Sequence, residues 1–354
     1  FAFFIYPIRE SLHQNETADM LQAILPTGCK GFIAMYRYWI FTSFYVMSEL
    51  WGNIVLFLLF WGFANQITKL DEAKRFYGLF GIGTNFSGIA AGQVSIFIAA
   101  LSFAPEAALD DPWQTSLTQL ISLVLIAGVF AMALFYYINR VAMKDPRLMP
   151  QDKELKKEDK VKLSMRENIR YLFTSKYIIY LTTIVISYNI IINLVEVLWK
   201  QEVRELHPNP LAYNTYMNEV TIVTGILATL TSLFVSGNSI RKFGWTFTAM
   251  ITPAILLVTS LGFFGFFFLK ERPELTTQLF NLTPLTLVVL FGSMQNCMSR
   301  AAKYTVFDAT KEMAFVPLPP ADKIKGKAAI DGICNRLGKS GGSVIYQGLL
   351  IACS

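Results

Sequence analysis

The chain has 354 residues, of which 53% are hydrophobic and only 16% are charged. Soluble domains carry about 25% charged residues, so this composition, with a mean hydropathy of +0.43, excludes an ordinary soluble protein and indicates a chain built for a lipid bilayer. The net charge of +6 does not indicate nucleic-acid binding, because the cations gather in short connections between apolar runs. Two histidines and four scattered cysteines predict neither a metal site nor a cofactor.

The apolar runs predict a series of membrane-spanning helices, each long enough for the roughly 20 residues that cross a hydrocarbon core. In chain order they lie at 37–67, 76–103, 113–139, 177–200, 217–235 and 247–269, then in a stretch that ends at Phe315, and in a last span that contains DGICNRLGKSGGSVIYQGLLIACS. The chain opens on FAFFIYP, which is typical of the last turns of a helix, and ends inside an apolar run. We therefore expect an internal fragment of a longer protein.

One basic stretch divides these spans into two groups. Residues 140–176 contain no apolar run and are rich in Lys and Arg, which predicts a cytoplasmic linker by the positive-inside rule. It would join an incomplete N-terminal helical bundle, residues 1–139, to an incomplete C-terminal bundle, residues 177–354. Two halves that each carry charge near mid-membrane are typical of major-facilitator-type transporters, which bind substrate where the repeats meet.

Polar side chains interrupt three of the predicted spans. Glu49 shares one helical stripe with Tyr38, Thr42 and Tyr45, so it should face other helices instead of lipid. A second stripe, roughly 60° wide on a regular helix, is formed by Thr182, Asn189, Asn193, Glu196 and Lys200. A third, within roughly 80°, holds Arg300, Lys303, Phe307 and Lys311. Three cations on one face predict an anionic ligand, and polyphosphate fits best because charge-assisted hydrogen bonds favour it.

Simpler interpretations stand beside these. Arg37 lies near the start of its span and either snorkels to the interface or binds substrate, whereas Lys200 fits an interface anchor better. The two glutamates, Glu49 and Glu196, are alternatively structural contacts between helices, and Arg300 and Lys303 can pair locally with Asp308. The string GICNRLGKS differs from a phosphate-binding P-loop by one residue in its spacing, so Gly338, Gly341 and Gly342 are interpreted as helix-packing or hinge positions.

Four strings carry a resemblance to a known family: RYWIFTSFYVMSELWGNIVLFLLFWGFAN, EAKRFYGLFGIGTN, NLVEVLWK and AAKYTVFDATKEMAFVPL. They resemble the ATP/ADP translocases of plastids and obligate intracellular bacteria, and the resemblance extends over nearly the whole chain. It implies an all-α, facilitator-like fold of twelve helices, of which this fragment would run from the end of the third helix into the eleventh. Of four membrane-embedded charges that the family needs for transport, three map to Glu49, Glu196 and Lys311; the fourth, a lysine, lies before Phe1.

The resemblance also implies a function. We expect a membrane antiporter, without catalytic activity, that exchanges external ATP for internal ADP, or alternatively a proton-coupled nucleotide importer of the same family. Its partners would be the nucleotides and the bilayer of a bacterial inner membrane or plastid inner envelope, without nucleic acid, and we expect a monomer. The predicted substrate-binding residues are Lys311, Glu49, Glu196, Arg300, Lys303, Asn193, Asn189 and Arg37.

Overall fold

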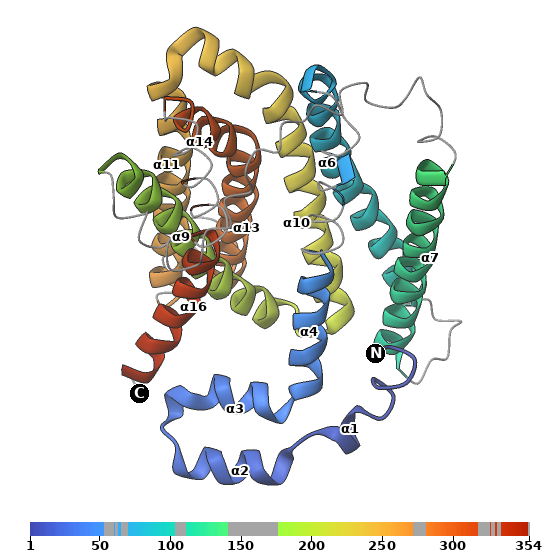
Figure 1. The fold of residues 1–354 in the computed structure, drawn as a ribbon. Helices are drawn as coiled ribbons and strands as arrows, with labels where there is room; N and C mark the ends of the chain where they lie inside the picture. Colours follow the sequence, from blue (N-terminus) through green and yellow to red (C-terminus); the bar gives the residue numbers. More distant parts are fainter. Residues whose placement is uncertain are drawn as a thin grey trace. The chain divides into compact units, whose positions relative to one another are not determined.

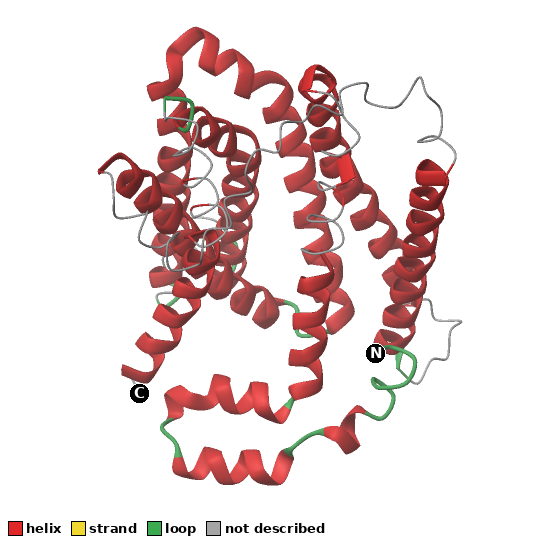
Figure 2. Ribbon diagram, in the orientation of Figure 1, coloured by secondary structure: helices red, strands yellow, loops and turns green. Residues whose placement is uncertain are grey.

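The structure is a computed structural model. It describes residues 1–52, 60, 63–64, 70–102, 111–140, 176–271, 281–317, 326, 330 and 334–352. Within these residues every regular element is a helix and no strand is present (Figure 2). The helices that are long and apolar enough to cross a membrane are Gly83–Ser102, Pro112–Arg140, Lys176–Leu206, Pro210–Phe234 and Asn238–Leu269. The expected all-helical membrane protein is confirmed at this level.

The chain divides into two compact units. Unit 1 comprises Phe1–Gly81, Phe97–Lys160 and Leu349–Ser354, and unit 2 comprises Ile82–Ile96 and Val161–Gly348. Of the predicted basic linker, 140–176, all but the first and last residues lie outside the described residues.

Unit 1 begins with a short helical hairpin. Its elements are α1 (Arg9–Leu12), α2 (Asn15–Ile24), α3 (Lys30–Arg37) and α4 (Trp39–Trp51), and α2 and α3 lie crosswise to α4 (Figure 1). The backbone leaves the helical region at Tyr38 (φ −105°, ψ 41°), so Arg37 ends α3. The predicted span 37–67 therefore began too early in the chain, because this break separates Arg37 from the apolar helix. Most of that span beyond Gly52 lies outside the described residues.

The long helices α6 (Leu70–Ser102) and α7 (Pro112–Arg140) match two predicted spans. Large apolar side chains on α7, such as Ile126 and Phe130, are 67% and 68% exposed. Such exposure is typical of a helix that contacts lipid, since a soluble protein rarely exposes a continuous apolar face.

Unit 2 gathers the helices of the second half. They are α9 (Lys176–Leu206), α10 (Pro210–Thr231), α11 (Gly237–Leu269), α13 (Pro284–Ala302), α14 (Asp308–Ala314) and α16 (Asn335–Ala352) (Figure 1). Helix α11 contains Pro253 and bends at Gly244, whose positive φ of 79° requires glycine. Helix α13 packs against α9, α10 and α11, so it forms the centre of this unit.

A buried hydroxyl ties three of these helices together. Trp199 of α9 donates its indole N–H to Ser293 Oγ of α13 at 3.0 Å, and the Tyr216 hydroxyl of α10 lies 2.7 Å from the same oxygen. One residue earlier, Gly292 lies against the Trp199 ring so closely that a Cβ would overlap it. The sequence Gly292-Ser293 thus sets both the spacing of α9 from α13 and the polar contact between them.

The stretch predicted as one regular helix up to Phe315 is interrupted. Thr283 caps α13 by accepting a hydrogen bond from the Thr286 N–H at 3.2 Å. Residues Lys303–Phe307 then form a π-helical turn, η5, before α14 begins. A π turn holds more residues than an α turn, so it rotates the next helical turns about the axis. The angle predicted between Lys311 and Arg300 on a regular helix was therefore wrong.

Prediction one concerns the glycine at the centre of unit 2. Gly292→Leu should lower the thermal unfolding midpoint of the purified protein, because overpacking costs about 1–3 kcal/mol. Gly265→Ala is the matched control, since a Cβ there meets nothing within 4 Å. Equal midpoints for the two variants would contradict the packing described for Gly292.

Candidate functional site

A three-residue ionic cluster joins α9 to α13. Glu196 accepts two hydrogen bonds on the same oxygen, Oε1: one from Lys200 Nζ at 2.7 Å and one from Arg300 Nη2 at 2.8 Å. Glu196 and Lys200 are four residues apart on α9, which places them on one face of the helix. Arg300 is in the last turn of α13, where the helix dipole favours a cation. The structure thus brings together two predicted site residues, Glu196 and Arg300.

An aromatic pair lies next to this cluster. The rings of Tyr188 on α9 and Phe307 on η5 are stacked at 4.4 Å with an interplanar angle of 15°. The Tyr188 hydroxyl donates to the Ser299 carbonyl at 3.1 Å, and Lys303 Nζ lies 5.9 Å from the Tyr188 ring centroid. That distance is within the range of a cation–π contact. Arg300, Lys303 and Phe307 therefore all face α9, as one common helical face predicts.

Positive charge accumulates around Lys303. Its ammonium is within electrostatic range of Arg300, Lys311 and Lys339 and of one carboxylate, Asp308. Lys311 Nζ lies 3.6 Å from Asp308 Oδ1, and its side chain is 11% exposed. Together with Lys200, these residues make five cations near the carboxylates of Glu196 and Asp308 in the part of the chain that the structure describes. Such a concentration of cations favours an anionic ligand, because charge-assisted hydrogen bonds to anions are strong.

The two predicted asparagines contact another helix. Asn189 donates to the Val185 carbonyl at 2.7 Å and to Asn335 Oδ1 of α16 at 3.0 Å. Asn193 Oδ1 accepts a hydrogen bond from Ser343 Oγ, also on α16, at 3.1 Å. In this structure both amides hold α16 against α9, and their predicted contact with substrate stays a prediction.

Glycines on α16 make that approach possible. A Cβ at Gly338 would lie 2.6 Å from Asn189 Cβ, and one at Gly342 would lie 2.7 Å from Asn193 Oδ1. These glycines were interpreted from the sequence as helix-packing positions, which is confirmed. Residues 338–342 lie inside a helix, so this end of the GICNRLGKS string is not a phosphate-binding loop.

The other two predicted site residues belong to unit 1. Arg37 Nη2 is 2.5 Å from Asp19 Oδ1 of α2 and 3.4 Å from Gln22 Oε1, so it fastens α3 to α2. Glu49 lies near the end of α4 with its side chain exposed. A role for either residue in substrate binding stays a prediction.

Sequence reasoning missed two members of the cationic cluster. Lys200 was interpreted as an interface anchor, but α9 continues for six residues beyond it, to Leu206. Its spacing of four residues from Glu196 was the available signal for an ion pair. Lys339 was set aside with the rejected P-loop string, and no local pattern places it near Lys303, which belongs to a different helix.

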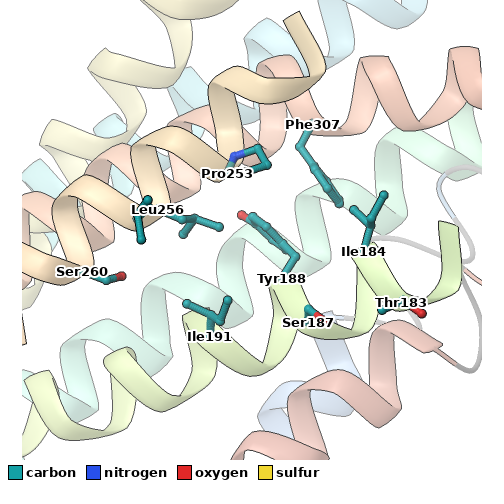
Figure 3. Close-up of a pocket in the computed structure, with 10 residues that line it drawn as sticks. Thr183, Ile184, Ser187, Tyr188, Ile191, Pro253, Leu256, Ser260 and Phe307 are labelled. Atoms are coloured by element: carbon teal, nitrogen blue, oxygen red, sulfur yellow. The ribbon is translucent and has the colours of Figure 1, made fainter. Parts of the chain in front are cut away.

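An apolar cavity of about 420 Å³ opens on another side of α9 (Figure 3). It is lined by Thr183, Ile184, Ser187, Tyr188, Ile191, Pro253, Leu256, Leu257, Ser260 and Phe307. On a regular helix Ser187 and Ile191 lie roughly 140° or more from Glu196. Two of its lining residues, Tyr188 and Phe307, also border Lys303, but the cavity wall is largely apolar and does not suit polyphosphate. Among the described residues no group of three or more His, Cys, Asp or Glu could hold a metal ion.

Long apolar helices, with a cationic cluster packed against one of them, α9, are typical of a multi-pass integral membrane protein of the transporter class. The model of the TLC ATP/ADP transporter family matches residues 1–354, so the chain belongs to this family. It is 45% identical over 358 residues to "ADP,ATP carrier protein 1" of Chlamydia pneumoniae, an alignment that covers 100% of this chain and 69% of that protein.

Plant proteins are also similar. The chain is 41% identical over 353 residues to the "Plastidic ATP/ADP-transporter" of Solanum tuberosum, covering 99% of this chain and 54% of that protein. It is 40% identical over 354 residues to "ADP,ATP carrier protein 1, chloroplastic" of Arabidopsis thaliana, covering 99% of this chain and 55% of that protein. The chain thus spans about half the length of these plant relatives. No solved structure matches it.

Prediction two concerns the ion pair between α9 and α13. Groups in direct contact show coupling energies of about 0.5–3 kcal/mol, and we expect the lower half of that range because 35% of the Arg300 side chain is exposed. Once Arg300→Gln has removed the pair, adding Glu196→Gln should lower the unfolding midpoint little further. The control combines Glu196→Gln with Arg241→Gln on α11, where the losses should add. Additive losses at both pairs would show that Glu196 and Arg300 do not stabilise each other.

Proposed function

We propose that this protein is an antiporter that exchanges external ATP for internal ADP by alternating access. The observation that carries the proposal is the group of cations around Lys303, next to α9, a helix long and apolar enough to cross a membrane. Arg300, Lys303, Lys311 and Lys339 would hold the polyphosphate, because charge-assisted hydrogen bonds to phosphate are strong. The names of the relatives from Chlamydia and from plants support ATP and ADP as the substrates.

The proposed architecture is a facilitator-like pair of bundles, residues 1–139 and 177–354, in a fold of twelve helices. A contact between the two halves of the chain supports it. A Cβ at Gly92 of α6 would lie 2.7 Å from Ile222 of α10, and one at Gly225 would lie 2.8 Å from Ile89. Ser95 Oγ of α6 accepts hydrogen bonds from Asn214 and Asn218 at 3.1 and 3.0 Å. Paired approach of this kind, in antiparallel order, is expected where one repeat rocks against the other.

The ionic cluster supports a mechanism for strict exchange. Glu196 offsets part of the charge of Arg300 and Lys200, so the site can satisfy part of its own charge without substrate. Lys311 contacts Asp308, and Arg300 is the residue that holds Glu196 across the two helices. A carrier held this way would reorient poorly until nucleotide phosphate competes for the cations.

The remaining proposals concern location and assembly. We place the protein as a monomer in a bacterial inner membrane or a plastid inner envelope, in line with the sources and names of its relatives.

Prediction three is that uptake needs nucleotide on the other side. Protein in vesicles loaded with ADP should accumulate labelled ATP several-fold faster than protein in empty vesicles, because the empty carrier returns slowly. Equal rates in the two preparations would contradict exchange. Uptake into empty vesicles that depends on an imposed pH gradient would instead support the proton-coupled alternative.

Prediction four compares two lysines. Lys311→Ala should lower ATP uptake by about tenfold or more, because a hydrogen bond to a charged group contributes about 1.5–3 kcal/mol. Lys270→Ala is the control and should lower uptake far less, because Lys270 pairs with Glu202 and Glu205 outside the proposed site. Both variants need protein amounts matched in the vesicles, and equal losses would remove Lys311 from the proposed site.

Lys270 suits this control because its side chain has its own ion-pair partners. It follows α11 and contacts Glu202 and Glu205 of α9 at 2.7 and 2.9 Å. Burial lowers the pKa of its ammonium, but the hydrogen bonds and charges of the two glutamates outweigh that effect and raise the pKa above its ordinary value. Lys270 is thus a charged lysine in the same unit, with partners of its own.

A further inference from the structure

Glu196 presents one carboxylate oxygen to two cations, and the two cations are not equivalent. Lys200 Nζ and Arg300 Nη2 lie 2.7 and 2.8 Å from Oε1. We propose that Lys200 is a phosphate-binding residue, which leaves Glu196 when a nucleotide enters and returns to it when the nucleotide departs. This inference rests on the proposed function. It names the lysine whose contact with Glu196 changes when a nucleotide binds to the same site.

Accessibility favours Lys200 as the cation that moves. Its side chain is 43% exposed, against 35% for Arg300 and 20% for Glu196. An incoming polyanion therefore meets more of the Lys200 side chain than of the Arg300 side chain. Lysine also carries a compact charge on a flexible stem, which can swing between two anions, whereas the planar guanidinium of arginine is better suited to hold one carboxylate.

Connectivity favours the same residue. Lys200 and Glu196 belong to one helix, so breaking their contact separates no elements, and pairs of this spacing are individually weak. Arg300 instead joins α9 to α13. When Lys200 leaves, Arg300 still neutralises Glu196 and keeps the two helices together. The Glu196 carboxylate therefore keeps a cationic partner throughout.

The position of Lys200 argues against a purely interfacial anchor. Six further residues of α9 lie beyond it, which at about 1.5 Å per residue is roughly 9 Å of helix. The acidic residues near that end, Glu202 and Glu205, are held by Lys270. Lys200 instead contacts Glu196. The same carboxylate oxygen contacts Arg300, which is one of the cations near Lys303.

The test is the affinity of the purified full chain for ADP, measured by equilibrium dialysis. Lys200→Gln should weaken ADP binding by about tenfold, as expected for the loss of a charged phosphate contact. The control Lys270→Gln should change the affinity far less, because Lys270 pairs with Glu202 and Glu205 instead of Glu196. Unfolding midpoints, measured on each variant, show that each remains folded.

A second background separates phosphate binding from a positioning role. In Glu196→Gln protein, Lys200→Gln should still weaken ADP binding by about the same factor, because the phosphate contact does not need the carboxylate. An effect that disappears in this background would overturn the proposal and make Lys200 a positioning residue for Glu196. Unchanged affinity of Lys200→Gln in the native background would overturn it as well. Native protein that fails to bind ADP would instead count against the proposed function.

Discussion

The ion pair between Glu196 and Arg300 is the interaction on which the second half of the molecule depends. A charged group inside a membrane span is costly, even at the lenient estimate of about 2.5–3.5 kcal/mol each. The pair reduces that free-energy cost only if α9 and α13 lie close together and Glu196 and Arg300 are at the same level along the two helices. The fit of Gly292 against Trp199 sets that distance, and the hydroxyl of Ser293 fixes the register by bonding to Trp199.

Around this pair, α9 separates two environments. One side carries Asn189, Asn193 and Glu196, which meet α16 and Arg300. Another carries apolar residues such as Ile184 and Ile191, which line a cavity shared with α11 (Figure 3). A span with a polar side and an apolar side can border a hydrated pathway and lipid at once, and a carrier for a highly charged solute requires both.

One irregular stretch of backbone lies next to the cations. The π turn from Lys303 to Phe307 comes directly after the last turn of α13, which contains Arg300. Such turns frequently occur at functional sites, because they redirect side chains that a regular helix would fix. Here Phe307 is turned onto Tyr188, so that Lys303 and the aromatic pair share one side of the helix.

The sequence by itself determined the membrane class, most of the spans and the family, because apolar runs and long matching strings are local properties of a chain. It also identified Glu196 and Arg300 as unusual, since charge inside an apolar run is visible without a fold. Only the tertiary structure decided which charges meet. The pairing of Glu196 with Arg300 joins residues 104 positions apart. The π turn and the proximity of Lys339 likewise depend on packing between helices, which no periodic pattern within one helix can encode.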